Sequence, residues 1–281
     1  MNDLKIAVFP HVLSADIREA VRKAAELGLE GLHVSTTGPL EPELLDAQAR
    51  RDLVDLFRAH GVAISAISYW GGEVDLGYPE QHATAIPAGK RALQLAADLE
   101  CGLWQAHVGI MPWETENPRW QAFVDALGEL AAYGEQLGAT LCLETGPEPP
   151  WVLKRMIQAL DSPGLGINLD PANLIIWRPI VAQDRGVEYT PEWGDENFGP
   201  ENAATLLGPW VRHTHAKDAR QEPDGTCPEV ALGQGDIDWV RYVSNLKAAG
   251  YQGFFAVERE CGEDPVGDVM RAVDFLRGLP V

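Results

Sequence analysis

Four side chains that can bind a metal ion stand at the ends of apolar segments in the second half of the chain. They are Glu144 in LCLETG, Asp170 in INLDPAN, His215 in HTHAKD and Glu258 in FAVERE. Each apolar run has the length and composition of a buried parallel strand. Because the carboxyl ends of parallel strands meet at one face of a barrel, we expect these side chains to converge there. Three carboxylates and one imidazole form a donor set for a divalent cation.

The rest of the sequence alternates similar strands with amphipathic helices. We expect strands over residues 5–9, 31–35, 62–68, 103–108, 140–144, 166–170, 210–215 and 253–258. The expected helices include residues 15–27, with Ser14 as the N-cap, and residues 120–137, which end before Gly138. This alternation predicts an α/β fold in which residues 1–281 form a single (β/α)8 TIM barrel.

One connection is long for such a barrel. Residues 174–209, after the sixth strand, are rich in Trp, Pro, Gly and charged side chains. Long connections in compact domains usually have a function or secondary structure of their own. We expect residues 201–207 to form the sixth barrel helix. The residues before them either cross the barrel mouth, contact another subunit of a homo-oligomer, or form a surface insertion without a catalytic role.

The composition of the chain indicates where the protein is located and which classes of partner it does not bind. The net charge is −20, with 42 acidic against 22 basic residues, which argues against a nucleic-acid partner. No apolar stretch reaches roughly 18 residues, and the amino-terminal segment lacks the pattern of a secretory signal. We therefore expect no membrane span and a cytoplasmic location. The 4 cysteines form no CxxC pair, so neither a disulfide framework nor a thiolate zinc site is indicated.

The two histidines of HTHAKD are not equivalent. His213 and His215 are two residues apart on one strand and therefore face the same side. If that side is the barrel lumen, His215 is the better ligand and His213 lies one layer deeper. Each ligand also has a purely structural alternative. His215 could be a hydrogen-bonded core residue, Glu144 and Asp170 could cap a loop or a helix, and Glu258 could form an ion pair. Convergence of three carboxylates favours the metal interpretation.

The order of the segments ETG, DPAN, HxHxKD, GQGDIDW and VERE resembles the sugar-phosphate isomerase/epimerase superfamily of xylose-isomerase-like TIM barrels. This group includes ketose 3-epimerases, hydroxypyruvate isomerase, inosose dehydratase and endonuclease IV. The resemblance implies that one divalent metal is bound by Glu144, Asp170, His215 and Glu258. Oxygen-rich ligands favour Mn²⁺, with Mg²⁺, Co²⁺ or Zn²⁺ as alternatives.

The sequence departs from its relatives at two places. Many epimerases of the group have Asp-x-x-His after strand six, where this chain has Asp170-Pro-Ala-Asn173. An amide can hydrogen-bond a hydroxyl group but cannot carry a proton between groups. Members of the endonuclease IV type need several further histidines, and this chain has Tyr69 and Trp70 after its third strand. Together with the charge, this argues against DNA repair.

Further polar and aromatic residues follow the expected strands. Those we expect to contact the substrate are His107, Trp113, Asn173, Lys217 and Arg220. A flat ring packs well on the apolar face of a sugar or cyclitol. The two cations suit an anionic or polyhydroxylated substrate, or they neutralise nearby carboxylates.

These residues predict a metal-dependent isomerase or epimerase acting on a small sugar or related polyol. Glu144 and Glu258 would be the catalytic carboxylates on either side of an enediolate, one removing a proton and the other or the same one returning it. A lyase of the inosose-dehydratase type is the alternative, and a non-catalytic barrel with a binding role is a third. Both phosphorylated and unphosphorylated substrates are compatible with the sequence.

Overall fold

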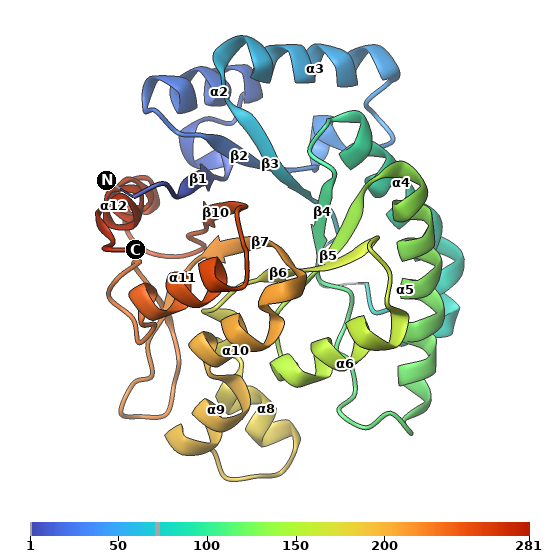
Figure 1. Ribbon diagram of the computed structural model, residues 1–281, viewed down its shortest axis with the longest axis vertical. Coiled ribbons are helices and arrows are strands. Elements are labelled where there is room, and N and C mark those ends of the chain that lie inside the picture. The colour runs from blue at the N-terminus through green and yellow to red at the C-terminus, as the bar shows by residue number, and fades with distance from the viewer. Residues whose placement is uncertain (1, 71–73) are drawn as a thin grey trace.

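The computed structural model describes residues 2–70 and 74–281, and its centre is a closed barrel of parallel strands (Figure 1). Around the barrel the order is β1-β10-β7-β6-β5-β4-β3-β2, so neighbours in the barrel follow one another in sequence once the short β8 and β9 are set aside. The barrel strands are β1 (Lys5–Val8), β2 (Gly31–Ser35), β3 (Ala63–Ser68), β4 (Leu103–Ala106), β5 (Thr140–Glu144), β6 (Leu165–Leu169), β7 (Val211–Ala216) and β10 (Phe254–Val257). This confirms the predicted α/β TIM barrel.

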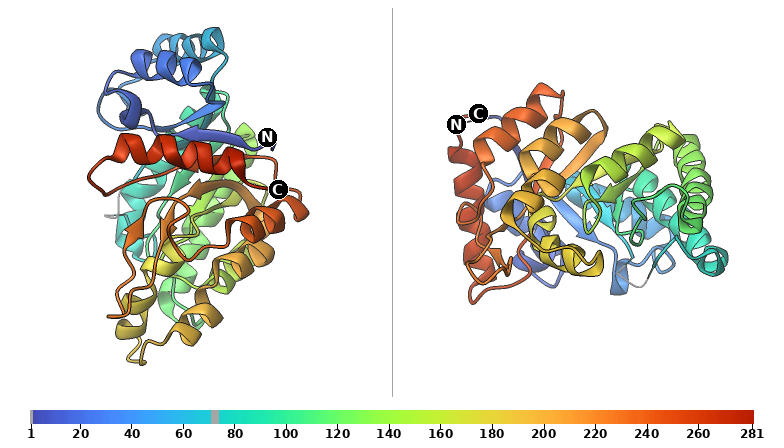
Figure 2. Two further views of the ribbon diagram at one scale, coloured as in Figure 1. Left: turned by 90° about the vertical axis from the view of Figure 1, so that its left-hand side faces the viewer. Right: turned by 90° about the horizontal axis from the view of Figure 1, so that it is seen from below.

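Helices surround the strands on the outside of the barrel, as the two views of Figure 2 show. They are α1 (Pro10–Leu13), α2 (Ile17–Glu26), α3 (Ala47–His60), α4 (Pro79–Asp98), α5 (Pro118–Leu137), α6 (Pro150–Leu160), α7 (Asn173–Ile176), α8 (Arg178–Asp184), α9 (Pro191–Phe198), α10 (Pro200–Leu207), α11 (Trp239–Ala248) and α12 (Pro265–Gly278), with short 3-10 turns at Gly38–Leu40 and Gly208–Trp210. Among the described residues, we find no helix that combines the length and the apolar character needed to span a membrane.

The ends of the helices follow local hydrogen-bonding rules. The prediction of Ser14 as the N-cap of α2 is wrong, because the side chain of Asp16 accepts hydrogen bonds from the amides of Arg18 (2.8 Å) and Glu19 (3.1 Å). A carboxylate at this position is also favoured by the helix dipole. Gly138 ends α5 as predicted, with a φ of 67° in the left-handed region that glycine adopts without strain.

Four strands end one or two residues earlier than the sequence suggests: β1 ends at Val8, and the other three end just before residues of the candidate site. β4 ends before His107, β6 before Asp170 and β10 before Glu258. Each of these side chains therefore belongs to the first residue of a loop at the carboxyl end of the barrel. A residue in that position is released from the alternation of the strand, so its side chain can lean over the barrel mouth.

The lumen of the barrel is polar beneath this mouth. His33, Ser65, Asn168 and His213 are all buried there, on β2, β3, β6 and β7. Large apolar side chains instead fill the space between strands and helices, among them Trp104, Phe123, Leu93 and Leu127.

The long connection after β6 contains helices α7 to α10. Helix α10 lies where we expect the sixth barrel helix, packed between α6 and α11. Helices α8 and α9 lie beyond α10, at the lower end of the molecule in Figure 1. A separate antiparallel pair, β8 (Asp218–Ala219) and β9 (Glu229–Val230), lies in the loop that follows β7.

Candidate metal centre

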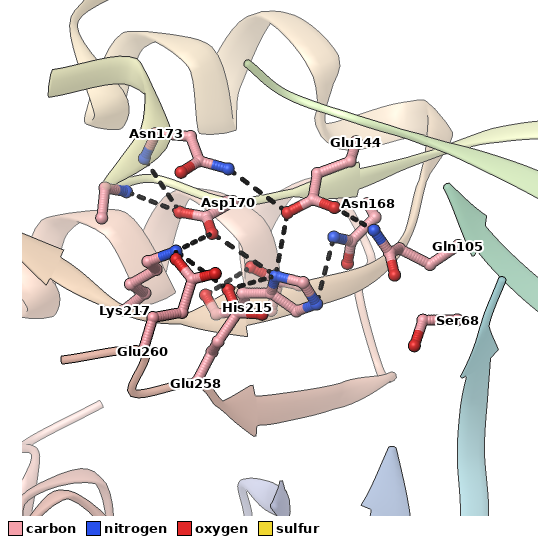
Figure 3. Close-up of polar contacts among 12 residues, drawn as sticks. Ser68, Gln105, Glu144, Asn168, Asp170, Asn173, His215, Lys217, Glu258 and Glu260 are labelled. Atoms are coloured by element: carbon pink, nitrogen blue, oxygen red, sulfur yellow. Dashed lines mark hydrogen bonds and ion pairs between the residues drawn. The ribbon is translucent and has the colours of Figure 1, made fainter. Parts of the chain in front are cut away.

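The four residues expected to bind a metal converge at the carboxyl end of the barrel (Figure 3). The Nδ1 atom of His215 is 3.2 Å from Oε1 of Glu144, 3.4 Å from Oδ2 of Asp170 and 3.2 Å from Oε2 of Glu258. One candidate ligand atom from each residue lies within 4.8 Å of all the others. Ligands at roughly 2.1 Å from a six-coordinate ion are about 3 to 4 Å apart, so this spacing suits a single cation.

The local charge also suits a cation. Glu144 and Asp170 are 7% and 0% exposed, and Glu258 lies beside them. Buried carboxylates need a compensating positive charge. The donor set of three carboxylates and one imidazole is chemically appropriate for Mn²⁺, Mg²⁺, Co²⁺ or Zn²⁺.

Glu144 and Glu258 are ionised at neutral pH and favour a protonated His215 when no metal is bound. Burial lowers the pKa of His215, but the charges of Glu258 and Glu144 outweigh it and raise the pKa well above its ordinary value. Burial raises the pKa of Glu258, yet His215 and Lys217 bring it down to about 2. Burial likewise opposes the effect of His107 and His215 on Glu144, whose pKa is lowered. A cation at this position would replace the proton on His215.

Asp170 uses its two oxygens for different purposes. Oδ1 accepts hydrogen bonds from the amides of Ala172 (2.9 Å) and Asn173 (3.0 Å), whereas Oδ2 faces His215. The hydroxyl of Thr145 fixes the backbone of the same residue, because it accepts from the Asp170 amide at 2.8 Å and donates to the Asp170 carbonyl at 2.7 Å. The cap and the ligand interpretations of Asp170 are therefore compatible.

Sequence reasoning did not single out Asn168, which lies beneath the ligands. Its Nδ2 is 3.3 Å from Nε2 of His215, and its Oδ1 is 2.8 Å from Nδ1 of His213. His213 continues to Ser65, with Nε2 3.3 Å from the hydroxyl oxygen. His213 thus lies one layer below His215, as expected. Strand alternation could have identified Asn168, because it is two residues before Asp170 and faces the same side.

Lys217 lies among carboxylates at the edge of the centre. Its ammonium is 3.2 Å from Oε2 of Glu258, forms an ion pair with Glu260, and is 4.0 Å from both Asp170 and Glu229. Burial lowers the pKa of Lys217, but the charges of Asp170 and Glu258 raise it above its ordinary value. Lys217 is therefore a permanent cation that neutralises this group of carboxylates.

Two more of the expected substrate-binding residues lie next to Glu144. His107 Nε2 is 3.2 Å from Oε2 of Glu144, and Asn173 Nδ2 donates to Oε1 at 3.3 Å. Gln105, which sequence reasoning missed, donates to Oε2 of the same carboxylate. Polar residues at the carboxyl ends of β2, β3 and β4, in HVS, AIS and LWQ, were the available signal for it and for Ser35 and Ser68.

The remaining two expected contacts lie outside the cavity lining. Trp113 packs edge-on against Trp151, with ring centroids 5.3 Å apart, and the guanidinium of Arg185 lies 3.9 Å from the Trp113 ring centroid. Arg220 pairs with Glu222 at 2.7 Å. Trp113 thus packs the loop after β4 against α6 and the end of α8, and Arg220 forms an ion pair within the loop after β8.

The candidate centre opens into a cavity of about 670 Å³, a size typical of small-molecule sites. The cavity is lined by Phe9, His11, Val12, Ser35, Ser68, Gln105, His107, Glu144, Asn173, Ile176, Trp177, Ile180, Lys217, Glu258, Arg259 and Glu260. Polar groups from the barrel strands form its floor, and apolar side chains from α7 and α8 form one wall. Such a mixture suits a ligand with many hydroxyl groups.

Comparisons with known proteins agree with this architecture. The chain is similar to L-ribulose-5-phosphate 3-epimerase UlaE from Shigella flexneri, with 24% identity over 197 residues, which are 67% of this chain. The chain spans 61% of the length of that relative.

Solved structures agree over nearly the whole chain. A xylose isomerase domain protein from Planctomyces limnophilus superposes with a TM-score of 0.79 at 24% identity, covering 98% of this chain and 96% of that one. A xylose isomerase-like TIM barrel protein from Mycobacterium smegmatis, in complex with magnesium, gives a TM-score of 0.71 at 17% identity, covering 96% and 94%. At these identities the likeness establishes the fold.

The family model described as xylose isomerase-like TIM barrel matches residues 21–279, which include every strand from β2 onward and all four candidate ligands. The chain therefore belongs to the xylose isomerase-like TIM barrel family.

Proposed function

We propose that this protein is a divalent-metal-dependent isomerase or epimerase of a small sugar or related polyol. The observation that carries the proposal is the convergence of three carboxylates on Nδ1 of His215 at the floor of an open cavity. Family membership and the similarity to a 3-epimerase support the same class of reaction. A cytoplasmic location and a homo-oligomer stay predictions from the sequence.

Glu144, Asp170, His215 and Glu258 would hold the metal, with Mn²⁺ expected first. When bound, a divalent cation polarises a carbonyl group and makes the neighbouring carbon more acidic. Asp170 and His215 are buried and have no access to a substrate carbon, so their task is to bind. Glu144 and Glu258 also line the cavity and can do more.

These two glutamates would move the proton. Both have a lowered pKa, so both are ionised at neutral pH and able to accept a proton. They come from β5 and β10, which are separated by β6 and β7 in the barrel, and therefore approach the cavity from different sides. Removal of a proton beside the carbonyl by one carboxylate gives an enediolate, and its return by the other, or by the same one, completes epimerisation or isomerisation.

The charge of the cavity favours an unphosphorylated substrate. Within the described residues, the lysine and the arginine that line the cavity both have carboxylate partners. Lys217 lies among Glu258 and Glu260, while Arg259 pairs with Glu229 at 2.6 Å and Asp268 at 2.9 Å. A phosphate group would have to compete with these carboxylates, whereas sugar hydroxyls can hydrogen-bond to them.

The test is an assay of ketoses and their phosphate esters with Mn²⁺-loaded protein in D₂O. We expect an isomeric or epimeric product from an unphosphorylated ketose, with solvent deuterium on the carbon that lost its proton. A dehydrated product that absorbs in the ultraviolet would instead establish the lyase alternative. Binding without turnover across the panel would favour the non-catalytic alternative and contradict the proposal.

The matched variants are Glu258→Gln and Glu129→Gln. Glu129 lies on α5 in an exposed pair with Lys90, far from the cavity lining, so its variant controls for the loss of one carboxylate charge. We expect Glu258→Gln to lose at least about 100-fold in turnover, in the range that general acid–base groups contribute. Metal occupancy is measured alongside, because the same side chain is a proposed ligand.

A further inference from the structure

A buried chain of three polar residues connects the candidate metal centre to the interior of the barrel. It runs from Nε2 of His215 to Asn168, then to His213 and Ser65, with separations of 3.3, 2.8 and 3.3 Å. Asn168 and His213 are 0% exposed and Ser65 is 3% exposed, so water does not reach this chain. Each polar atom in it must therefore be satisfied by its neighbour.

The side of His215 that faces away from the carboxylates depends on Asn168. Within the part of the chain that the structure describes, Asn168 is the hydrogen-bonding partner of Nε2. The other buried ring nearby, His33, packs against His215 with centroids 5.2 Å apart, and neither of its nitrogens forms a hydrogen bond within the described residues. The orientation of the Asn168 carboxamide therefore determines whether Nε2 of His215 donates or accepts a hydrogen bond.

The orientation of the Asn168 amide in the structure fits a neutral His215 ring with a lone pair on Nε2. Asn168 directs its amide nitrogen at Nε2 of His215, and an amide nitrogen can only donate. The ring proton must then be on Nδ1, the atom that faces the three carboxylates. In the same arrangement, His213 donates from Nδ1 to Oδ1 of Asn168.

A metal ion at the carboxylates reverses this requirement. The ion uses the lone pair of Nδ1, so the proton of the neutral ring must be on Nε2. Nε2 then needs an acceptor, and the carboxamide oxygen of Asn168 can supply one if the amide turns over. The amide nitrogen then points at His213, whose Nδ1 must accept, so that the His213 proton moves to Nε2 and is donated to Ser65. The doubly protonated ring that the carboxylates favour without a metal also carries a proton on Nε2. It therefore demands the same orientation, with the carboxamide oxygen of Asn168 facing Nε2.

We propose that Asn168 is a positioning residue of the metal centre, which selects the metal-binding tautomer of His215 by accepting a hydrogen bond from its Nε2. In this orientation the amide nitrogen of Asn168 donates to Nδ1 of His213. His213 is therefore held as the Nε2–H tautomer, although it does not touch the metal. This inference rests on the proposed metal centre and extends it to a layer below the ligands. Partners of this kind fix the ring orientation of ligating histidines and increase their basicity.

The direct test is nitrogen-15 NMR of histidine-labelled protein loaded with Zn²⁺, a diamagnetic probe for the site. Resonances are assigned from single histidine variants. In the zinc form we expect His215 to be bound through Nδ1 and protonated on Nε2, and His213 to be protonated on Nε2 with a free lone pair on Nδ1. A His213 ring protonated on Nδ1 in the zinc form would overturn the inference while leaving the metal centre intact. Failure of Zn²⁺ to bind at these ligands would contradict the proposed centre itself.

Two substitutions separate the role of Asn168 from simple packing. Asn168→Leu keeps a branched side chain, although a larger one, and has no acceptor. We expect it to bind Zn²⁺ about 10 to 100-fold more weakly, the usual effect of losing such a partner. Asn168→Asp keeps the acceptor for His215, so its zinc affinity should equal or exceed that of the wild type.

The aspartate variant has a second signature. Its carboxylate accepts from both histidines, so His213 should become the Nδ1–H tautomer in the zinc form. Zinc affinities are measured by competition with a chelator, with circular dichroism as the check on folding. Equal zinc affinity of Asn168→Leu and the wild type, or an unchanged His213 tautomer in Asn168→Asp, would contradict the proposed role.

Discussion

Three of the four proposed ligands have one polar atom directed at the metal position and another held by the barrel. Oδ1 of Asp170 accepts hydrogen bonds from two backbone amides. Oε2 of Glu144 accepts from Gln105 and lies beside His107. His215 meets Asn168 with the nitrogen that faces away from the carboxylates. Side chains held in this way lose little conformational freedom when the ion arrives.

The two histidines of β7 should differ in their effect on metal binding. We expect His215→Ala to weaken Mn²⁺ binding by at least about 100-fold, because it removes a ligand, and His213→Ala by about 10-fold, because it removes a partner of Asn168. Calorimetric titration of both variants measures the difference. Equal losses, or a greater loss for His213→Ala, would show that the ligand assignment is wrong.

Glu148 provides a test of the electrostatics away from the ligands. It is 3% exposed, accepts a hydrogen bond from the Met111 amide at 2.7 Å, and burial raises its pKa from 4.5 to about 7. A raised pKa means that the folded state favours the neutral carboxyl. The contribution of the neutral Glu148 carboxyl to the stability of the folded state is complete below pH 4.5. It is lost as the pH rises through about 7.

Glu148→Gln keeps the acceptor for Met111 but cannot ionise. We expect this variant to exceed the wild type in free energy of unfolding by up to about 3 kcal/mol at about pH 8, at about 1.4 kcal/mol per pKa unit. The advantage should shrink toward about pH 5. Urea denaturation of the metal-free proteins at the two pH values measures it, and an advantage that does not depend on pH would contradict the explanation.

Among the secondary-structure elements, the side-chain positions at the ends of strands were predictable from the sequence, whereas those in loops were not. The convergence of the four candidate ligands was predictable because each lies at the end of an apolar run of strand length, and parallel strands bring their carboxyl ends together. Trp113 was placed at the substrate because it follows β4, yet its loop turns it toward Trp151 and Arg185. The path of a loop depends on tertiary contacts that no local pattern of residues encodes.

The helices after β6 form one wall of the cavity, and Arg178 holds them together. Its side chain is 4% exposed, donates to the carbonyls of Leu174 (3.1 Å) and Phe198 (3.2 Å), and pairs with Asp195 at 3.0 Å. These bonds tie α8 to the end of α9. The neighbouring Trp177 and Ile180 line the cavity, so the position of this wall depends on Arg178.

Arg178→Met should therefore affect both stability and substrate binding. Two buried carbonyls lose their donor, and we expect the free energy of unfolding to fall by about 2 to 4 kcal/mol. The KM should rise more than kcat falls, because the variant disturbs the wall and leaves the ligands in place. Arg58→Met on α3 is the control, since its ion pairs are exposed and contribute about 0 to 1 kcal/mol. Identical melting of the two variants would refute the role of Arg178.

The proposed metal centre would connect several strands of the barrel. Its four candidate ligands lie at or just beyond the carboxyl ends of β5, β6, β7 and β10, so a bound ion would join neighbouring strands over half of the barrel. Binding that is specific to the folded state stabilises it by mass action, by about 2.7 kcal/mol when free metal is roughly 100 times its Kd. The barrel architecture was predictable from alternating strands and helices, and strand alternation places His213 beneath His215. The hydrogen bonds that join His213 to Asn168 and Ser65 on other strands depend on the register between strands, which the sequence does not give.

Removal of metal should accordingly lower the thermal stability of the protein. We expect chelation to reduce the Tm by about 5 to 10 °C, at about 2 to 4 °C per kcal/mol for a domain of this size. Differential scanning calorimetry of the Mn²⁺-loaded and chelated proteins measures the shift, and His215→Ala is the control, in which the shift should be nearly absent. An equal shift in that variant would place the stabilising metal elsewhere.

In the proposed centre, one cation is bound jointly by Glu144, Asp170, His215 and Glu258. A crystal structure of the Mn²⁺-loaded protein, with anomalous data collected near the manganese edge, tests it most directly. We predict a single strong anomalous peak at the carboxyl end of the barrel, at roughly 2.0 to 2.4 Å from one atom of each of the four side chains. A peak bound by other residues, or four side chains that stay together at full manganese saturation without a peak between them, would contradict it.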